Sequence, residues 1–465
     1  MQNWIEWQQK APKFCSWLLI DDEVAEPHRS QLFNAAEPVE FIHIRFSVSP
    51  GMPGNFAADS VSFPAMQTVS SSESDCRSCS VRRDRSRCQL FFVLSFFQGL
   101  LMTASVVADQ QRLFIGTYTE GSNSQGIYTC RFDGDSGQLG EPDLAAVTVN
   151  PSFLTLHPTQ PLLYCVNEVD DFEGSAQGAV SAFELDLDTG RLSFVNQQPS
   201  LGGAPCHLVV DNTGKFVLVA NYLGGNAIVL PVATSGRLAA ASCQVQLEGS
   251  GPDAARQQAP HAHSVNLSRD NRTAYVADLG TDRIWTYEFN PQQGLLANSS
   301  PAYAVGAPGG GPRHLAIHPS GLLAWSNNEM TATVMTFERN PANGVLRLSD
   351  EASTLPADYS GRRSTSECLV HPNGKFVYVG NRGHDSIAVF AVHTNGQLKR
   401  LQIQNTLGKE PRNFFVMPDG RWLLAANQNS NSIVVFRIEP DGTLYASDSM
   451  IHVESPVCIR SIAIN

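Results

Sequence analysis

The sequence predicts an all-β fold, a seven-bladed β-propeller whose blades are four-stranded antiparallel sheets. First, the block 364–390, STSECLVHPNGKFVYVGNRGHDSIAVF, holds three short apolar runs separated by turn-forming residues, the pattern of three consecutive strands. Second, this block recurs along the chain at steps of 46 to 57 residues. Third, an incomplete copy stands at each end of the repeat. A strand-built repeat of about 50 residues is typical of propeller blades.

Five further copies keep the same order of apolar run, turn and apolar run. They cover residues 154–167, 208–221, 265–278, 315–328 and 414–427. The turn positions that we take as equivalent are Pro158, Asn212, Arg269, Pro319, Pro372 and Pro418. Each copy predicts the first and second strands of one blade, and the apolar run after it predicts the third.

The two incomplete copies predict how the ring closes. Residues 112–132 hold only the second and third strands of the unit, and residues 456–465 hold only the first. Together they make one blade, so we expect seven blades, with the C-terminal strand joining the N-terminal blade. This closure leaves no open sheet edge between the first and last blades. A ring that needs no partner to cover an edge favours a monomer.

The composition agrees with this fold class and excludes one class of partner. The 465 residues include 36 Gly and 27 Pro, as expected for a β-rich chain with many turns. The net charge of −12 argues against binding nucleic acid through a general basic surface. A local basic pocket is still compatible with this net charge.

The N-terminal region carries no copy of the repeat, and the propeller is expected over residues 109–465. Residues 1–80 lack periodicity and include a Ser-rich run, so we expect them to be disordered or not to belong to the working protein. Residues 81–108 combine an arginine cluster, an apolar run and small residues, as a secretory signal peptide does. The apolar run is too short for stable membrane insertion.

The position of this signal-like segment leaves the compartment open. If translation starts just before the arginine cluster, the segment begins the chain and the protein is exported to the periplasm or beyond. If translation starts at Met102, the ring is cytoplasmic. The sequence supports both starts.

The cysteines point to no metal centre. Cys76 and Cys79 form a lone Cys-x-x-Cys pair without a second pair at zinc spacing. Six others are spread one per blade at strand positions, where small buried apolar residues are expected. They are Cys130, Cys165, Cys206, Cys243, Cys368 and Cys458. We therefore predict neither a metal nor another cofactor.

Residues that recur at one position in many blades are expected to serve the blade rather than a site. His157, His318 and His371 stand just before the turn proline. An asparagine stands nine residues after the turn position in five blades, at 167, 221, 328, 381 and 427. Asn side chains bond local backbone and tolerate unusual dihedral angles, so we expect both sets to be structural.

Three other columns of the repeat vary in identity and are unusually polar. Six residues before the turn position stand Ser152, Cys206, His263, Arg313, Ser366 and Arg412. Five before it stand Phe153, His207, Ser264, His314, Glu367 and Asn413. Ten after it stand Glu168, Tyr222, Leu279, Glu329, Arg382 and Gln428, with Tyr118 in the incomplete blade.

These columns predict a pocket at one mouth of the ring. The first two strands of a blade are antiparallel, so residues six before and ten after the turn lie near the same end of the hairpin. If the first strand is innermost, the charged members from four adjacent blades share one pocket. They are His263, Arg313, Glu329, Glu367, Arg382 and Arg412. The alternative is that these charges form ion pairs that hold neighbouring blades together.

The residue types in this pocket indicate acid/base chemistry on an anionic substrate. Guanidinium groups bind carboxylate or phosphate through planar, permanently charged forks. A carboxylate and a histidine beside them can act as general acid and base. The chain has no G-x-S-x-G, H-E-x-x-H or G-x-x-x-x-G-K-[ST] motif, so we expect no covalent nucleophile and no nucleotide.

The blocks HAHSVNLSRDNRTAYVADLG, GGGPRHLAIHPSGLLAWSNNE, SECLVHPNGKFVYVGNRG and EPRNFFVMPDGRWLLAAN resemble the seven-bladed lactonase family. That family includes the propeller-type 6-phosphogluconolactonase and the carboxymuconate cyclase. The resemblance covers the ring from about Arg112 to the end. It implies catalytic roles for His263, Arg313, Glu329 and Arg382. Arg412 keeps the family's arginine, although its EPRNF motif departs slightly from the usual pattern.

The resemblance implies a metal-independent hydrolase that opens an anionic sugar lactone, with 6-phosphogluconolactone as the first candidate. Arg412, Glu367, His207 and His314 are the predicted substrate-binding residues, and either His263 or Glu329 is the base. A lactone-forming cycloisomerase of the carboxymuconate type would need the same residues. A propeller that binds a ligand or partner without catalysis is the third possibility.

Overall fold

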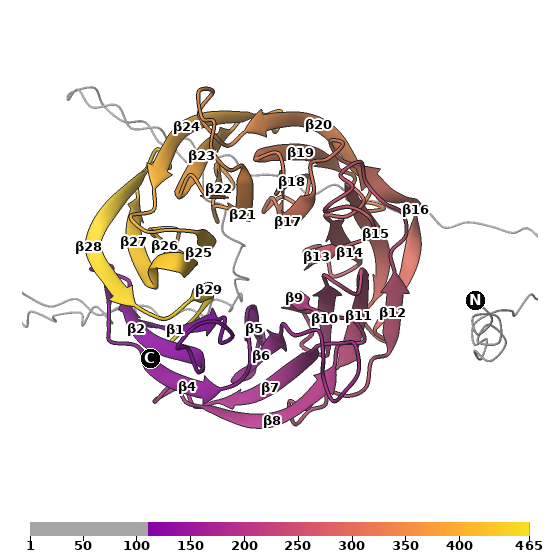
Figure 1. Ribbon diagram of the computed structural model, residues 1–465, viewed down its shortest axis with the longest axis vertical. Coiled ribbons are helices and arrows are strands. Elements are labelled where there is room, and N and C mark those ends of the chain that lie inside the picture. Colours follow the sequence, from indigo (N-terminus) through magenta and orange to yellow (C-terminus); the bar gives the residue numbers. More distant parts are fainter. Residues whose placement is uncertain (1–109, 465) are drawn as a thin grey trace, which may run out of the picture. The chain divides into compact units, whose positions relative to one another are not determined.

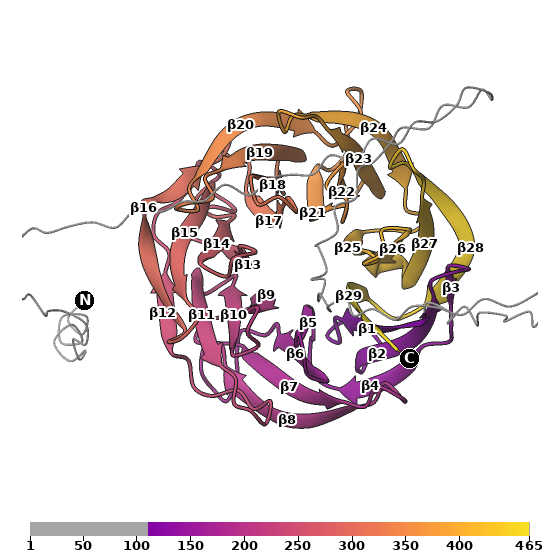
Figure 2. The same cartoon turned by 180° about the vertical axis from the view of Figure 1, so that it is seen from behind.

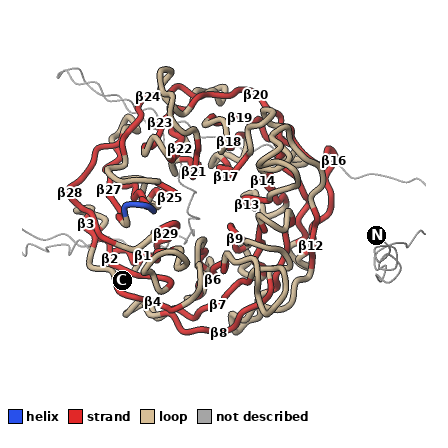
Figure 3. The backbone as a smooth tube through the Cα atoms, viewed as in Figure 1, coloured by secondary structure: helices blue, strands red, loops and turns tan. Residues whose placement is uncertain are grey.

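The computed structural model describes residues 110–464, and the predictions for residues 1–80 and 81–108 lie outside this range. Figure 1 shows seven sheets arranged around a central axis, and Figure 3 shows that strands dominate the described chain. The single described helix is the short 3₁₀ turn η1 (Gln428–Ser430). The predicted all-β, seven-bladed propeller is confirmed.

Blades 1 to 3 come from the N-terminal part of the ring and the last strand. Blade 1 holds β1 (Gln110–Thr117), β2 (Gly126–Asp133), β3 (Gln138–Leu139), β4 (Asp143–Val147) and β29 (Pro456–Ala463). Blade 2 holds β5 (Leu154–Leu156), β6 (Leu162–Asn167), β7 (Ala179–Leu185) and β8 (Leu192–Pro199). Blade 3 holds β9 (Pro205–Val210), β10 (Phe216–Asn221), β11 (Asn226–Pro231) and β12 (Cys243–Gln246).

Blades 4 to 7 follow in chain order. Blade 4 holds β13 (Ala262–Leu267), β14 (Thr273–Asp278), β15 (Arg283–Asn290) and β16 (Leu295–Val305). Blade 5 holds β17 (Pro312–Ile317), β18 (Leu323–Asn328), β19 (Thr333–Arg339) and β20 (Leu346–Ser353). Blade 6 holds β21 (Ser364–Val370), β22 (Phe376–Arg382), β23 (Ser386–Val392) and β24 (Leu398–Asn405). Blade 7 holds β25 (Pro411–Val416), β26 (Trp422–Asn427), β27 (Ser432–Ile438) and β28 (Leu444–His452).

The first strand of each repeat lies innermost, as the sequence predicts. In Figures 1 and 2 the strands β5, β9, β13, β17, β21, β25 and β29 surround the axis, with later strands further out. The second strands are covered by neighbouring blades on both faces, and every residue of β6, β10, β14 and β26 is buried. This burial explains their continuous apolar sequences, whereas an outer strand such as β20 is mostly exposed.

The ring closes through the C-terminal strand. β29 pairs antiparallel with β1 from Gln111↔Ala463 to Thr117↔Pro456, which confirms the predicted closure. The outer edge of this blade is divided, because β3 and β4 both pair with β2 at different positions. The last strand of the chain is therefore the inner strand of the first blade.

The recurring histidines and asparagines hold neighbouring blades together, in agreement with their predicted structural role. Each histidine ring places Nε2 within hydrogen-bond distance of a turn-glycine carbonyl in the next blade. The pairs are His157–Gly214 (3.0 Å), His318–Gly374 (3.2 Å) and His371–Gly420 (2.9 Å). The asparagine amides donate to the connection from the preceding blade. These bonds are Asn221–Ser200 (2.7 Å), Asn381–Thr354 (3.1 Å) and Asn427–Thr406 (3.2 Å).

The cysteines of the ring differ in one respect from the prediction. Their distribution of one per blade is wrong, because Cys130 and Cys458 share blade 1 and Cys206 and Cys243 share blade 3. All six are free thiols, and all except the half-buried Cys243 are buried. Within residues 110–464 there is no cluster of three His, Cys, Asp or Glu side chains with metal-site geometry. The same residues contain no helix of the length and apolarity that a membrane crossing requires.

Candidate active site

A β-bulge in three of the inner strands positions a residue of one predicted site column, the column six residues before the turn. In β13 Ala262 pairs with Asp278 and Ser264 pairs with Ala277, so His263 is an extra residue between them. Cys206 in β9 and Arg412 in β25 occupy the same kind of position. A bulge leaves its extra residue outside the regular ladder and changes the direction of its side chain. These side chains therefore gather at the mouth of the ring where the inner strands begin.

Arginines from three parts of the chain converge on Glu329, which directly follows β18. Arg313 Nε lies 3.1 Å from Oε2, Arg382 Nη2 lies 2.7 Å from Oε2, and Arg256 Nη2 lies 2.9 Å from Oε1. His263 Nε2 lies 3.7 Å from Oε2. Arg313 belongs to the same blade as Glu329, and Arg382 belongs to the next. The predicted convergence of His263, Arg313, Glu329 and Arg382 is thus present, and the ion pair to Arg382 also joins two blades.

The cationic surroundings fix the charge state of Glu329. Burial alone would raise the pKa of Glu329, but the surrounding cations, with Arg382 first among them, hold it well below its usual range. Burial lowers the pKa of Arg382 to about 10 although Glu329 opposes this shift. Both groups are therefore ionised near neutral pH, and Glu329 is a weak proton acceptor.

His263 is the neutral group of the cluster. Its side chain is buried, and burial lowers its pKa well below the usual histidine range, with the charge of Arg313 acting in the same direction. Its Nδ1 lies 3.6 Å from Cys206 Sγ. Burial raises the pKa of the Cys206 thiol, so this sulfur stays protonated. An uncharged imidazole beside a cationic cluster can accept a proton from water.

Arg412 approaches the site from β25 in blade 7. Its Nη2 donates to the Tyr118 hydroxyl at 2.6 Å, and its guanidinium lies 4.9 Å from the centre of the Tyr118 ring. The Tyr118 hydroxyl donates in turn to Glu168 Oε2 at 2.9 Å, and Ser152 Oγ donates to the same oxygen. The hydroxyl and ring of Tyr118 thus fix the direction of Arg412.

These groups enclose a cavity of about 410 Å³. It is lined by Glu168, Cys206, Tyr222, Arg256, His263, Glu329, Arg362, Arg363, Ser364, Arg382 and Arg412. Five arginines face two glutamates, which gives a formal charge of +3 with His263 neutral. The cavity is therefore basic although the whole chain carries −12. Its size suits a small molecule.

Arg313 and three predicted substrate-binding residues do not line this cavity. Arg313 lies behind it, where Nη1 donates to Ser366 O at 2.5 Å and to His314 Nε2 at 3.1 Å. His314 Nδ1 then donates to Glu367 Oε1 at 2.5 Å.

The side chains of Asn413 and His207 complete this buried layer. Glu367 also accepts from Asn413 Nδ2 at 2.6 Å. The His207 ring stacks obliquely on Phe153, with 4.2 Å between ring centres. The structure therefore places His207, His314 and Glu367 in a buried layer that supports Arg313 instead of in the cavity wall.

Three lining arginines were missed by the sequence analysis because they lie outside the repeat. Arg256 comes from the long connection between β12 and β13, and Arg362 and Arg363 come from the connection between β20 and β21. Arg362 is itself paired with Glu410. The only available signal was the presence of arginines in long inter-blade connections of an acidic chain.

The comparison with known families decides the classification. Residues 112–461, more than half of the chain, match the family described as Lactonase, 7-bladed beta-propeller. The chain belongs to the seven-bladed lactonase family. Its propeller, its inner-strand bulges and its basic cavity are therefore features of a lactonase-family enzyme.

Relatives in this family carry names that describe lactone chemistry. The 6-phosphogluconolactonase of Bacillus subtilis is 37% identical over 302 residues, which cover 65% of this chain and 83% of that protein. The 6-phosphogluconolactonase of Formosa agariphila is 33% identical, with coverage of 65% and 86%. The solved structure of a periplasmic gluconolactonase of Pseudomonas aeruginosa is 34% identical with a TM-score of 0.72, and the match covers 77% of this chain and all of that one.

Proposed function

We propose that this protein hydrolyses an anionic sugar lactone, with 6-phosphogluconolactone as the first candidate, by acid/base catalysis that needs no metal. The observation that carries the proposal is a cavity of about 410 Å³ with five arginines, an ionised carboxylate and a neutral histidine. The names of the two 6-phosphogluconolactonase relatives support the lactone substrate. The arginines suit its phosphate, because guanidinium binds phosphate through paired hydrogen bonds.

In this mechanism His263 acts as the base. It takes a proton from water while the water oxygen bonds to the lactone carbonyl carbon and the carbonyl electron pair moves onto oxygen. Arg382 and Arg412 stabilise the resulting oxyanion or hold the phosphate. Collapse of the intermediate breaks the bond to the ring oxygen, and the imidazolium returns its proton to that oxygen. The products are a free hydroxyl group and a carboxylic acid, which loses its remaining proton to the solvent and becomes a carboxylate.

We assign Glu329 a different task. Both carboxylate oxygens of Glu329 already contact guanidinium groups, so neither is free to take a proton from water. Glu329 instead fixes the three guanidinium groups that contact it. Arg313 belongs to the same support, because it contacts Glu329 but does not line the cavity. This assignment separates the two residues between which the sequence left the choice open.

The test is hydrolysis of 6-phosphogluconolactone by the full-length protein, with the spontaneous rate subtracted. Arg382→Ala is expected to lower kcat/KM by roughly 10²-fold or more, because it removes an oxyanion or phosphate donor. Arg347→Ala is the matched control, since Arg347 is exposed on β20 and pairs only with the exposed Glu338 among the described residues. Wild-type rates no faster than spontaneous opening, or full activity of Arg382→Ala, would reject the proposal.

Two further substrates belong in the same assay. Unphosphorylated glucono-1,5-lactone is included because one relative is named a periplasmic gluconolactonase. A carboxylated diene acid is included because a lactone-forming cycloisomerase would use the same arginines and base. Turnover of the diene acid with no hydrolysis of either lactone would replace the hydrolase by the cycloisomerase.

A further inference from the structure

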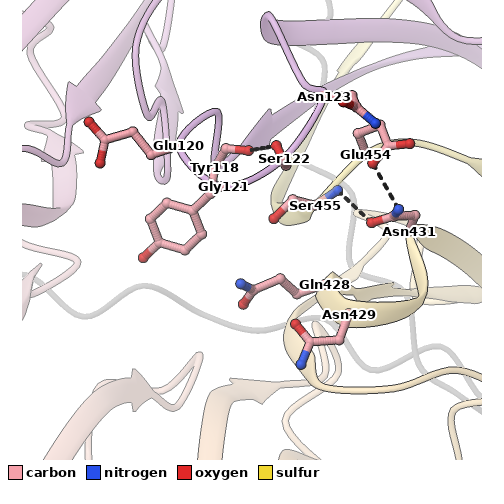
Figure 4. Close-up of a pocket in the computed structure, with 10 residues that line it drawn as sticks. All are labelled: Tyr118, Glu120, Gly121, Ser122, Asn123, Gln428, Asn429, Asn431, Glu454 and Ser455. Atoms are coloured by element: carbon pink, nitrogen blue, oxygen red, sulfur yellow. Dashed lines mark hydrogen bonds between the residues drawn. The ribbon is translucent and has the colours of Figure 1, made fainter.

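Tyr118 and Gln428 belong to the same polar column as Glu329 and Arg382, yet neither of them lines the basic cavity. They line a second cavity of about 700 Å³ (Figure 4). Tyr118 joins the two spaces, because its hydroxyl contacts Glu168 and Arg412, both of which line the basic cavity. The second cavity therefore adjoins the first at the same mouth of the ring.

The second cavity differs from the basic one in its chemistry. It is lined by Tyr118, Glu120, Gly121, Ser122, Asn123, Gln428, Asn429, Asn431, Glu454 and Ser455. Four amides, three hydroxyls and two carboxylates face this space, and its lining includes no Arg, Lys or His. Amides and hydroxyls both donate and accept hydrogen bonds, and carboxylates only accept. An anionic group would meet repulsion here, whereas a neutral group with many hydroxyls would find partners of both kinds.

One wall of this cavity is fixed and the other is free to bind. Asn431 Nδ2 donates to Glu454 Oε2 at 2.8 Å, and Ser455 N donates to Asn431 Oδ1 at 3.0 Å, so these side chains are held in place. By contrast, the backbone N–H groups of Gln428 and Asn429 donate to Glu410 O and Lys409 O, but their side-chain amides make no hydrogen bond to another residue in the range 110–464. In Figure 4 the Gln428 amide projects toward the space that the Tyr118 ring also faces.

We propose that this second cavity binds a neutral, hydroxyl-rich sugar unit attached to the lactone that occupies the basic cavity. The inference rests on the proposed lactone hydrolysis and adds a substrate class, namely lactones derived from disaccharides. The sugar hydroxyls would bond to Gln428 and Asn429, and its apolar ring face would lie against Tyr118. Glu120 and Glu454 would accept hydrogen bonds from further sugar hydroxyls and repel a second anion.

The experiment measures binding of stable reaction products by calorimetry to the full-length protein. The probes are gluconate, with one sugar unit, and cellobionate, maltobionate and lactobionate, each with a neutral second unit that differs in its sugar or in its linkage. At least one disaccharide acid is expected to bind about tenfold more tightly than gluconate, which is the effect of one or two net hydrogen bonds. In the double variant Gln428→Ala/Asn429→Ala this preference should fall to about one.

The double variant should fold, because Asn429 is exposed and Gln428 is half-buried on the short turn η1. Gln292→Ala is the matched control, since Gln292 is an exposed side chain on the β15–β16 turn, at the opposite end of the strands. It should keep the full preference. Equal affinity for all four acids, or an undiminished preference in the double variant, would overturn the inference.

Binding and turnover separate this inference from the function on which it rests. The four probes are products, so their affinities do not depend on catalysis. Absence of lactone hydrolysis with an intact disaccharide preference would reject the hydrolase and keep the second cavity as a sugar site. Lactone hydrolysis without any preference for the disaccharide acids would keep the hydrolase and reject the second cavity as a sugar site.

Discussion

At the scale of single residues, the most consequential contacts are those between Glu329 and the guanidinium groups of Arg256, Arg313 and Arg382. Replacement by Gln leaves buried positive charges without their counter-ion. We expect Glu329→Gln to lower the free energy of unfolding at pH 7 by about 3–5 kcal/mol. Urea denaturation measures this loss. The same variant should lose most of its lactonase activity, because the arginines are no longer held in place.

The pH dependence of that loss follows from the direction of the pKa shift. The pKa of Glu329 is lower in the folded protein, so its stabilising effect is complete above the unfolded value of about 4.3. It disappears as the pH falls through the lower, folded value. Glu338→Gln is the control, because its pair with Arg347 is exposed, and it should cost less than about 1 kcal/mol. Equal stabilities of wild type and Glu329→Gln at pH 7 would contradict the expected role.

His263 allows a separate prediction about activity. Burial lowers its pKa, and the base must be uncharged, so kcat/KM should stay constant down to about pH 6.5 and fall only below it. Glucono-1,5-lactone is the suitable substrate because it has no phosphate group. A phosphate would change its own charge at about pH 6 and so add a second titration to the profile. The exposed His452→Gln variant should keep the wild-type profile. A half-maximal value at or above pH 6.5 would exclude His263 as the buried base.

At the scale of elements, the inner strands are tied together behind the cavity. Glu367 on β21 accepts from His314 on β17 and from Asn413 on β25. Glu367→Gln weakens both bonds, so we expect a loss of about 1.5–3 kcal/mol in the free energy of unfolding. Since Glu367 lies outside the cavity wall, KM should change less than about twofold. A large rise in KM with unchanged stability would restore the predicted substrate-binding role.

The bulges explain which parts of the site could be predicted. Alignment of the repeat placed His263 and Arg412 in one column and Glu329 and Arg382 in another, and both pairs reach the cavity. The neighbouring column of His207, His314 and Glu367 was expected there too. Side chains next to each other on a strand point in different directions, and a bulge shifts that alternation locally. Sequence periodicity alone does not show on which residue the bulge falls.

The parts that could not be predicted come from segments outside the repeat. Arg256 lies 13 residues before Arg269, in a connection that has no equivalent in the other blades. A residue without a counterpart in the repeat has no column from which to infer its position. The fold depends on periodic apolar runs, so the number of blades and the closure of the ring could be predicted, whereas the divided outer edge of blade 1 could not. The site depended partly on long connections, whose course is determined by tertiary contacts.

At the scale of the whole molecule, the stability of the ring depends on its last strand. β29 is the only strand that pairs with the inner edge of β1 in the described ring. Its buried residues Cys458 and Ile459 belong to two different apolar clusters. Removal of residues 456–465 would therefore expose an unpaired strand edge together with apolar surface on both sides.

We expect the chain lacking residues 456–465 to aggregate and to lose the cooperative thermal transition of the wild type, because exposed edges pair with other chains. Size-exclusion chromatography and thermal unfolding measure the two effects. A chain that lacks only Asn465 is the control and should behave as wild type, since β29 ends at Ala463. A synthetic peptide of residues 454–465 in excess should restore the transition, because it can pair with β1 as β29 does. A monomeric truncated chain with the wild-type Tm would mean that six complete blades are held together without closure of the ring.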